Sequence, residues 1–197
     1  MRAKILHFHA ANDEDMLMQY LKAKYSIFYK DQGMSSLMVD KKNEVACIDN
    51  YDISSNFTYS LVNGTVAGFL RDTDCKNGFP HASLFEKYSE TVTKLKTASL
   101  NALCVYKYYR GKYYIIGRNE EKLSYAMMKE SIHRLKENNY DLIITSTSDT
   151  LARKMFLPLG FVVLESGVKY ELSTDPISNL VLLLTERSRS MFPCLNY

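Results

Sequence analysis

SLNALCVYKYYR, residues 99–110, is the stretch around which the rest of this chain is arranged. Its density of β-branched, aromatic and apolar side chains predicts a strand. A short apolar piece, YYIIG, follows after Gly111-Lys112. A helix is then expected to begin at Asn119, a good N-cap, with Glu120 and Glu121 in its positive first turn.

The segments after residue 122 repeat the alternation of helix and strand. The expected helix carries an apolar stripe at helical spacing, made of Leu123, Ala126, Met127, Met128, Ile132 and Leu135. DLIITSTS, residues 141–148, predicts a buried strand, and TLARKMFLPLGF, residues 150–161, a short helix closed by Pro158 and Gly160. A strand follows, and residues 168–184 predict two more around a turn at Asp175-Pro176. This order predicts a mixed α/β (α+β) fold whose neighbouring strands are covered by helices.

Length and charge limit the class of protein. A chain of 197 residues suits one domain with a sizeable core, so residues 1–197 are expected to form a single domain. The formal net charge is +3, from 25 basic and 22 acidic side chains. Since this balance lacks the excess and the long basic runs of nucleic-acid binders, no nucleic-acid partner is expected.

The cysteines and the chain start indicate the compartment. The four cysteines form no C-x-x-C pair and no metal spacing, which favours free thiols in a reducing cytoplasm. The first residues lack an apolar core long enough for a signal peptide, and the apolar run 180–184 is too short to cross a bilayer. His7 and His9 lie two apart without a third ligand at matching spacing, so no metal site is expected.

The first third of the chain predicts a strand, a helix and a hairpin. Residues 1–9 read as a strand, and residues 12–15 cap a helix that runs to about Lys30 and is broken at Gln32-Gly33. Residues 57–63 and 65–71 form a hairpin, because Asn63-Gly64 supplies the positive φ angles of a tight turn. Residues 81–90 predict a short helix, and residues 89–98 a polar connection to the strand at 99–110.

The ending of the short helix resembles a known fold. Its pattern, Ala152, Phe156 and Gly160-Phe161 after strand, helix and strand, looks like the second half of the GNAT acyltransferase fold. That resemblance implies a mixed central sheet flanked by helices. It also implies that two central strands splay apart, and that the acyl thioester of a pantetheine arm enters between them.

The first half of the chain resembles the acyl-homoserine-lactone synthases, a GNAT branch that acylates an amino-acid-derived amine. The matched positions keep the family's order and spacing over about residues 15–184. They are Lys24 four before Phe28, the acidic pair Asp49 and Asp52, the Gly-x-x-Arg ending Gly68 and Arg71, and Phe85 on a short helix. The resemblance implies acyl transfer from an acyl-carrier-protein thioester to an amine.

Several family positions hold other residues. The family's W-E-x-S-R strand is replaced here by Leu-Asn-Ala-Leu-Cys, residues 100–104, which removes the Glu that is a candidate base and the Arg. Met34 stands where the family has Trp, and Asp72-Thr73-Asp74 replaces a proline-rich motif. The common GNAT acid, a Tyr, falls at Phe156. Enzymes that make N-acyl amino acids share the fold without all of this network and are the nearer resemblance.

The resemblance and the side-chain chemistry together name the candidate site. Asp49, Asp52 and Arg71 are expected to hold the second substrate, since carboxylates suit an ammonium and a guanidinium suits a carboxylate. A structural salt-bridge cluster is the alternative for the same residues. The expected substrate-binding residues are Lys24, Phe28, Phe85, Asn101, Val105, Tyr106, Ser146 and Phe156.

The expected chemistry is aminolysis of a thioester. Unpaired backbone amides near Val105 and Tyr106 would hold the carbonyl oxygen. Asn101 cannot accept a proton at neutral pH, so an aspartate acting directly or through water is the expected base. The departing thiolate would be protonated by water or by one of the tyrosines at 106–114.

No permanently bound cofactor is expected, and the donor is an acyl-phosphopantetheine thioester. Glu120 and Glu121 at the start of the expected helix would repel the pyrophosphate of CoA, which favours acyl carrier protein as donor and partner. Lys107, Arg110 and Lys112 are the expected docking residues.

Three functions remain open on the sequence. The first is an N-acyltransferase that makes an acylated amino acid or related signal molecule. The second is a GNAT that acetylates a small amine or a protein from acetyl-CoA. The third is a non-catalytic descendant that binds an acyl ligand or a partner.

Overall fold

The computed structural model describes residues 1–169, 176–193 and 195. Its contacts divide the chain into two compact units, residues 1–72 with 102–131 and residues 73–101 with 132–197. The strand β6 (Thr97–Val105) and the helix α3 (Leu123–Glu137) contribute residues to both. The single domain expected for residues 1–197 stays a prediction.

The strands confirm the mixed α/β class. Seven of them form ladders that are mostly antiparallel, in the order β1-β4-β5-β6 for the first unit and β6-β9-β11-β10 for the second. The first unit also holds two small sheets, β2 with β3 and β7 with β8. Its further elements are β1 (Ala3–His9), a 3-10 turn (Ala10–Asn12), α1 (Glu14–Lys24), a π-helix (Tyr25–Asp31), β2 (Val39–Asp40), β3 (Val45–Ala46), β4 (Asn56–Val62), β5 (Thr65–Asp74), a 3-10 turn (Lys107–Tyr109), β7 (Tyr113–Ile116) and β8 (Asn119–Lys122).

The hairpin of β4 and β5 confirms the turn read from the sequence. Asn63 and Gly64 have φ angles of 51° and 82°, the left-handed pair that a two-residue hairpin turn requires. The register sets Phe57 opposite Arg71 and Tyr59 opposite Phe69, so these four side chains share one face. β1 adds Phe8 opposite Phe57.

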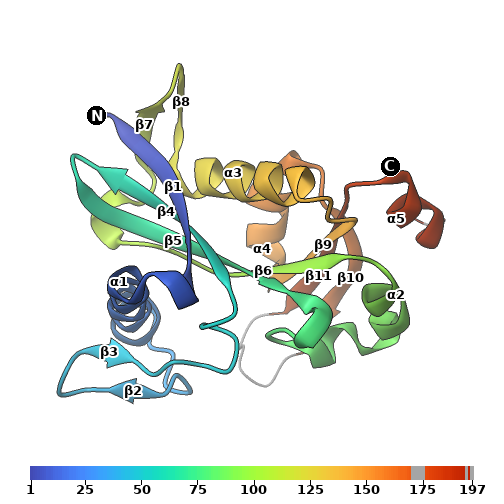
Figure 1. Cartoon of the computed structure of the whole chain (residues 1–197), viewed down its shortest axis with the longest axis horizontal. Helices are drawn as coiled ribbons and strands as arrows, with labels where there is room; N and C mark the ends of the chain where they lie inside the picture. The colour runs from blue at the N-terminus through green and yellow to red at the C-terminus, as the bar shows by residue number, and fades with distance from the viewer. Residues whose placement is uncertain (170–175, 194, 196–197) are drawn as a thin grey trace. The chain divides into compact units, whose positions relative to one another are not determined.

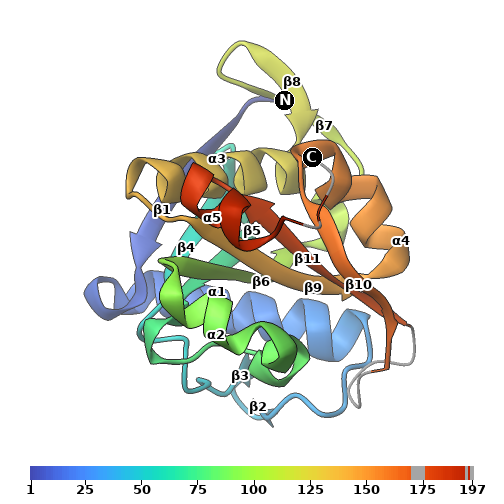
Figure 2. The same cartoon turned by 90° about the vertical axis from the view of Figure 1, so that its right-hand side faces the viewer.

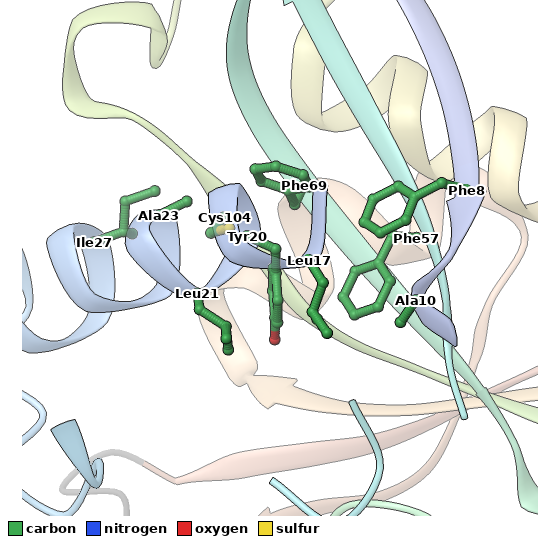
Figure 3. Packing of buried hydrophobic residues seen from close by; sticks show 10 residues of the cluster. All are labelled: Phe8, Ala10, Leu17, Tyr20, Leu21, Ala23, Ile27, Phe57, Phe69 and Cys104. Atoms are coloured by element: carbon green, nitrogen blue, oxygen red, sulfur yellow. The ribbon is translucent and has the colours of Figure 1, made fainter. Parts of the chain in front are cut away.

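Helix α1 packs its apolar stripe on that face (Figure 3). Asp13 caps the helix by accepting from the Met16 amide at 3.0 Å, as the sequence predicted. The buried cluster joins the helix stripe to the aromatic residues of the strands and to Cys104. Its members are Phe8, Ala10, Leu17, Tyr20, Leu21, Ala23, Ile27, Phe57, Phe69 and Cys104. The expected continuation to about Lys30 is present, but as a π-helix that ends before Gly33, φ 69°.

The backbone of β6 lies close against β5 at Gly68. A Cβ atom on Gly68 would lie 2.5 Å from the carbonyl oxygen of Cys104 and 3.0 Å from Val105 Cγ2. Ala102, two residues before Cys104, has a φ of 52°, a left-handed conformation unusual for alanine. Glycine is therefore required at this position of the Gly-x-x-Arg motif, because β6 leaves no room for a side chain there.

Two expectations for residues 106–122 are wrong. The strand at 99–110 ends at Val105, and Lys107–Tyr109 form a 3-10 turn. Asn119 does not cap a helix; Asn119, Glu120, Glu121 and Lys122 form β8, which pairs antiparallel with Tyr113–Ile116 of β7. Helix α3 begins only at Leu123. Cross-strand pairing outweighs the local capping preference here, and the apolar YYII segment that supplies the partner strand is the reason.

The second unit is built on β6, β9, β11 and β10, with β9, β11 and β10 side by side (Figure 2). The parallel register between β6 and β9 covers Thr97–Ser99 and Leu142–Ile144. β11 pairs antiparallel with both β9 and β10. The elements of the second unit, besides part of β6, are a 3-10 turn (Cys75–Asn77), a 3-10 helix (Ala82–Tyr88), α2 (Ser89–Lys94), part of α3, β9 (Leu142–Ser148), α4 (Asp149–Leu151), a π-helix (Ala152–Phe156), a 3-10 turn (Leu157–Leu159), β10 (Val162–Val168), β11 (Ile177–Leu183) and α5 (Glu186–Met191).

Most predictions for the second unit are confirmed. The strand at 142–148, the helical segment ending at Gly160 (φ 88°) and the next strand are present. The polar connection expected at 89–98 is wrong, because α2 occupies Ser89–Lys94 and β6 starts at Thr97. Of the tail, β11 is confirmed, whereas the turn residue Asp175 lies outside the described residues. None of the described helices is long and apolar enough to cross a membrane.

Candidate functional site

The charged residues predicted from the sequence meet in one ion network in the first unit. Arg71 donates through Nη1 to both oxygens of Asp49, at 2.9 and 2.7 Å, and also to Asp52 Oδ1. Lys24 donates through Nζ to Asp49 Oδ2 at 3.0 Å and to Asp52 Oδ2 at 3.3 Å. The two positive and two negative side chains sum to no net charge. Each buried ion therefore has a partner of opposite charge, which offsets the cost of removing it from water.

Three separate segments hold the network. Lys24 is the last residue of α1, Arg71 stands on β5, and the two aspartates lie in the turn after β3. That turn is shaped by its own carboxylates: Asp49 Oδ1 accepts from the Tyr51 and Asp52 amides at 2.9 and 3.0 Å. Asp52 Oδ2 accepts from the Asp49 amide at 2.9 Å. Since Asp side chains readily bond the backbone two or three residues on, the spacing Asp-x-x-Asp folds locally into this turn.

Burial divides the network into an inner and an outer part. The side chains of Asp52, Arg71 and Lys24 are 0%, 4% and 8% exposed, whereas Asp49 is 37% exposed. Asp49 is thus the member that a molecule from solvent can reach directly. Arg71 holds the Asp49 side chain and Asp52 holds the Asp49 backbone amide. The expected grip of a substrate by Asp49, Asp52 and Arg71 stays a prediction.

Electrostatics keep the Asp49 carboxyl ionised. Burial alone would raise its pKa, but the charges of Arg71 and Lys24 outweigh burial and lower the pKa to about 2. Burial would likewise lower the pKa of Arg71, and the neighbouring carboxylates raise it above its usual value instead. A carboxylate with so low a pKa is a weak base at neutral pH, so the expectation that an aspartate takes the proton does not fit Asp49.

The stability of the chain at acid pH tests whether the pKa of Asp49 is lowered. A carboxyl with a lowered folded-state pKa contributes stability above its unfolded pKa of about 3.9, and that contribution disappears as the pH falls through the folded value. The free energy of unfolding of Asp49→Asn is therefore expected to lie below that of the natural chain at pH 7. The difference is expected to shrink between about pH 4 and the folded pKa of about 2. Urea unfolding across pH checks it, and a difference that stays constant down to pH 2 contradicts it.

Tyr20 is a neighbour of the network that sequence reasoning missed. The ring is fully buried, with its centroid 4.5 Å from that of Phe57 and 5.6 Å from Lys24 Nζ. Burial raises the pKa of the Tyr20 phenol well above its usual value. The hydroxyl has no hydrogen-bond partner among the described residues and points away from Phe69 (Figure 3). Tyr20 lies in the core cluster with Leu17 and Leu21, and its residue type alone did not distinguish it from an ordinary core aromatic.

The remaining predicted residues of the first unit lie along the core cluster. Phe28 and Tyr106 are partly buried and pack against it. The amide of Tyr106 donates to the carbonyl of Ala67 at 3.0 Å, so the expectation of an unpaired amide is wrong for Tyr106. β6 ends in a bonded pair with β5 at this point, which is the physical reason. For Val105, which is buried beside Gly68, that role stays a prediction.

Four predicted residues belong to the second unit. Asn101 donates through Nδ2 to the carbonyl of Ser99 at 3.1 Å, a bond that uses one of its donors. Ser146 on β9 donates to Asn179 Oδ1 on β11 at 2.7 Å, and Asn179 in turn donates to the Leu84 carbonyl at 2.8 Å. This chain of bonds connects the helical segment of Phe85 to the strands.

Phe85 and Phe156 are buried aromatic residues of that unit. Phe85 lies 6.1 Å from Phe79 and Phe156 lies 5.3 Å from Phe161, each pair edge to face. Both contacts are ordinary core packing. Substrate contact for these two residues stays a prediction.

The electrostatic argument against a CoA donor is wrong. It placed Glu120 and Glu121 in the first turn of the helix, but both lie on β8, and Glu121 pairs with Lys129 at 3.1 Å. Of the expected docking residues, Lys107 and Lys112 are exposed. Arg110 is exposed as well, but it donates to the Val105 carbonyl at 2.6 Å and pairs with Asp31 at 3.3 Å.

No set of three or more His, Cys, Asp or Glu in the described part of the chain is placed to hold a metal ion. His9, one of the two histidines noted in the sequence, accepts from the Ala11 amide through Nδ1 at 3.2 Å. That bond ends β1.

The sequence matches no family model and no curated protein. Solved structures do match. The CoA-dependent acyl-homoserine lactone synthase BjaI, solved with SAM and isopentyl-CoA, has a TM-score of 0.66 at 15% identity, covering 96% of this chain and 87% of that one. FeeM, an N-acyl amino acid synthase from uncultured soil microbes, has a TM-score of 0.66 at 14% identity, with 96% and 94% covered.

A third match broadens the comparison. A putative N-acetyltransferase from Lactobacillus plantarum has a TM-score of 0.58 at 13% identity, covering 94% of this chain and all of that one. Similarity at these identities shows the fold. The fold expected from the resemblance to acyl-homoserine-lactone synthases, N-acyl amino acid synthases and GNAT acetyltransferases is thereby confirmed.

Proposed function

We propose that this chain is an N-acyltransferase that moves an acyl group from a phosphopantetheine thioester to the amine of an amino acid or amino-acid-derived molecule. The observation that carries the proposal is the ion network. Lys24, Asp49, Asp52 and Arg71, which the sequence resemblance singled out from distant positions, contact one another. The fold shared with an acyl-homoserine lactone synthase and an N-acyl amino acid synthase supports the same reading.

The network suits the binding of an amine. The partly exposed Asp49 carboxylate stays charged over the whole physiological range, because its pKa is about 2. An ammonium group gains a charge-assisted hydrogen bond from such a carboxylate. In this proposal Arg71, Lys24 and Asp52 are positioning residues, since their burial prevents them from meeting the acceptor directly.

The reaction itself is aminolysis. The ammonium gives up a proton to water, the neutral nitrogen attacks the thioester carbonyl carbon, and a carbon–nitrogen bond replaces the carbon–sulfur bond. The thiolate leaves, the nitrogen loses its second proton through water, and the thiolate takes up that proton, so the products are an amide and a free pantetheine thiol. Water takes the base role here because Asn101 stands where the family has Glu and Asp49 is too weak a base.

The donor carrier is acyl carrier protein or CoA. The exposed Lys107 and Lys112 favour an acidic carrier protein, while BjaI, with the same fold, is a CoA-dependent synthase. Turnover of one acyl chain as its carrier-protein, CoA and bare pantetheine thioester decides this. We expect the carrier-protein thioester to react fastest. Equal rates with the carrier-protein and CoA thioesters would refute a surface that binds the carrier protein.

Product analysis tests the function. The purified chain is incubated with acyl thioesters and the amino acids, and the expected result is an N-acyl amide seen by mass spectrometry. Asp49→Asn is expected to raise KM for the amine at least tenfold with a smaller change in kcat, since it removes the charge that binds the ammonium. Glu186→Gln is the matched control, because that carboxylate is 86% exposed in the second unit.

Other outcomes of this experiment have a definite meaning. No amide with any donor, in a chain that unfolds cooperatively, overturns the proposal and leaves a non-catalytic acyl-binding protein. The Lactobacillus plantarum match favours a second candidate, acetyl transfer from acetyl-CoA to a small amine. That candidate predicts acetylated product alone and thermal stabilisation by CoA.

A further inference from the structure

The hairpin of β7 and β8 exposes apolar side chains on one face. Tyr114 is fully buried, whereas its neighbours Tyr113 and Ile115 are 59% and 44% exposed, as expected for alternate residues of a strand. In the register, Tyr113 lies opposite Lys122 and Ile115 opposite Glu120, so these four side chains share the outer face. The hairpin extends beyond the start of β1, near the N-terminus, in the first unit (Figure 1).

Cations are interleaved with these apolar groups. Lys112 places its Nζ 3.7 Å from the ring centroid of Tyr108, which is 67% exposed, and Lys122 lies 5.4 Å from that of Tyr113. Arg118 stands exposed at the turn. Glu120 is the exposed carboxylate of this face, while Glu121 is engaged by Lys129 at 3.1 Å. Positive charge is therefore in excess on the hairpin.

The start of the chain adds to the same surface. The Ile115 amide donates to the Met1 carbonyl at 2.9 Å, and Arg2 forms a parallel bridge with Ile115. This contact sets Met1, 57% exposed, and the exposed Arg2 beside β7. Apolar and cationic groups thus come from two distant parts of the sequence.

We propose that this hairpin surface, formed by Tyr108, Lys112, Tyr113, Ile115, Arg118 and Lys122, binds the surface of an anionic lipid bilayer. Lysine and arginine are attracted to acidic headgroups, tyrosine rings are favoured at headgroup depth, and an aliphatic side chain gains by entering the acyl boundary. An acidic protein surface would attract the same cations, and the vesicle experiment below distinguishes it from a bilayer. The inference does not require the proposed acyl transfer, but it assigns Lys112, named above for the carrier protein, to the lipid surface.

Vesicle flotation tests it with the full chain. Vesicles of phosphatidylcholine with 30% phosphatidylglycerol are expected to carry the protein at low salt, and pure phosphatidylcholine vesicles far less. Each exposed cation near a bilayer contributes about a fivefold gain in partitioning, so K112E/R118E/K122E is expected to lose at least twentyfold. Y113S/I115S keeps the charge and is expected to lose at least threefold at 150 mM salt, where attraction between charges is screened.

A charge-matched control separates a specific surface from overall charge. K136E/R153E/K154E reverses three exposed cations of the second unit and should bind vesicles within twofold of the natural chain. Absence of binding to the anionic vesicles, or equal losses in both triple variants, overturns the proposal. If vesicles are not bound and K112E/R118E/K122E slows only the carrier-protein thioester, while the bare pantetheine thioester reacts normally, the surface serves an acidic protein and the proposal is again overturned. Unchanged thermal unfolding of each variant shows that the hairpin change has not unfolded the chain.

Discussion

Asp52→Ala is expected to lower the free energy of unfolding by about 3–5 kcal/mol, because it leaves two buried cations with the partly exposed Asp49 as their remaining carboxylate partner in the network. Asp52 is fully buried and accepts from Lys24 at 3.3 Å, from Arg71 and from the Asp49 amide at 2.9 Å. Removing these acceptors exposes none of the partners to water. Chemical unfolding at pH 7 measures the loss.

Two further variants show whether charge pairing is the cause. Asp49→Ala is expected to cost less, since that side chain is 37% exposed and water can replace part of what is lost. The pair Lys24→Met and Asp52→Leu removes one charge of each sign and is expected to recover much of the loss, as apolar replacements of buried pairs often do. An Asp52→Ala cost below about 1 kcal/mol, similar to that of an exposed pair, would contradict the buried network.

Gly68→Ala is expected to destabilise the fold by about 3 kcal/mol, at the upper end of the cost of overpacking. The added methyl group would lie 2.5 Å from the Cys104 carbonyl oxygen, so the backbone of β5 or β6 must move. Movement there also shifts Arg71, three residues along β5. The melting temperature and the free energy of unfolding both report the loss.

Gly64→Ala is the matched control for Gly68→Ala. Gly64 has a φ of 82° and open space around its Cβ position, so alanine there meets conformational strain without a clash. A cost of about 1 kcal/mol is expected at Gly64. Equal costs at the two positions would mean that close approach of β6 is not the reason for glycine at position 68.

Locally determined elements were predicted well. Asp13 caps α1 and Asn63-Gly64 turns the hairpin because each acts on backbone a few residues away. The apolar stripe of α3 is also confirmed where Met127, Met128 and Leu135 are fully buried. Such signals depend on side chains within one turn, so sequence alone carries them.

Elements that depend on a partner strand or on neighbouring segments were predicted poorly. Asn119 has the residue type of an N-cap, yet pairing with Ile116 places it in a strand. The Tyr106 amide was expected to be unpaired, but Ala67 on β5 accepts from it. The first outcome comes from a hairpin around residues 117–118, which the capping residue type at Asn119 does not reveal. The second comes from a hydrogen bond to another segment, β5.

The candidate site shows the same division. The resemblance to the acyl-homoserine-lactone synthases named Lys24, Asp49, Asp52 and Arg71, because these residue types stand at the family's positions and spacing. Only the tertiary structure decided that Asp49 meets solvent while Asp52 and Arg71 are enclosed, and that Tyr20 lies beside them. Burial is a property of how α1, β5 and the aspartate turn pack together. It therefore sets which carboxylate reaches solvent, which the identity of the residues leaves open.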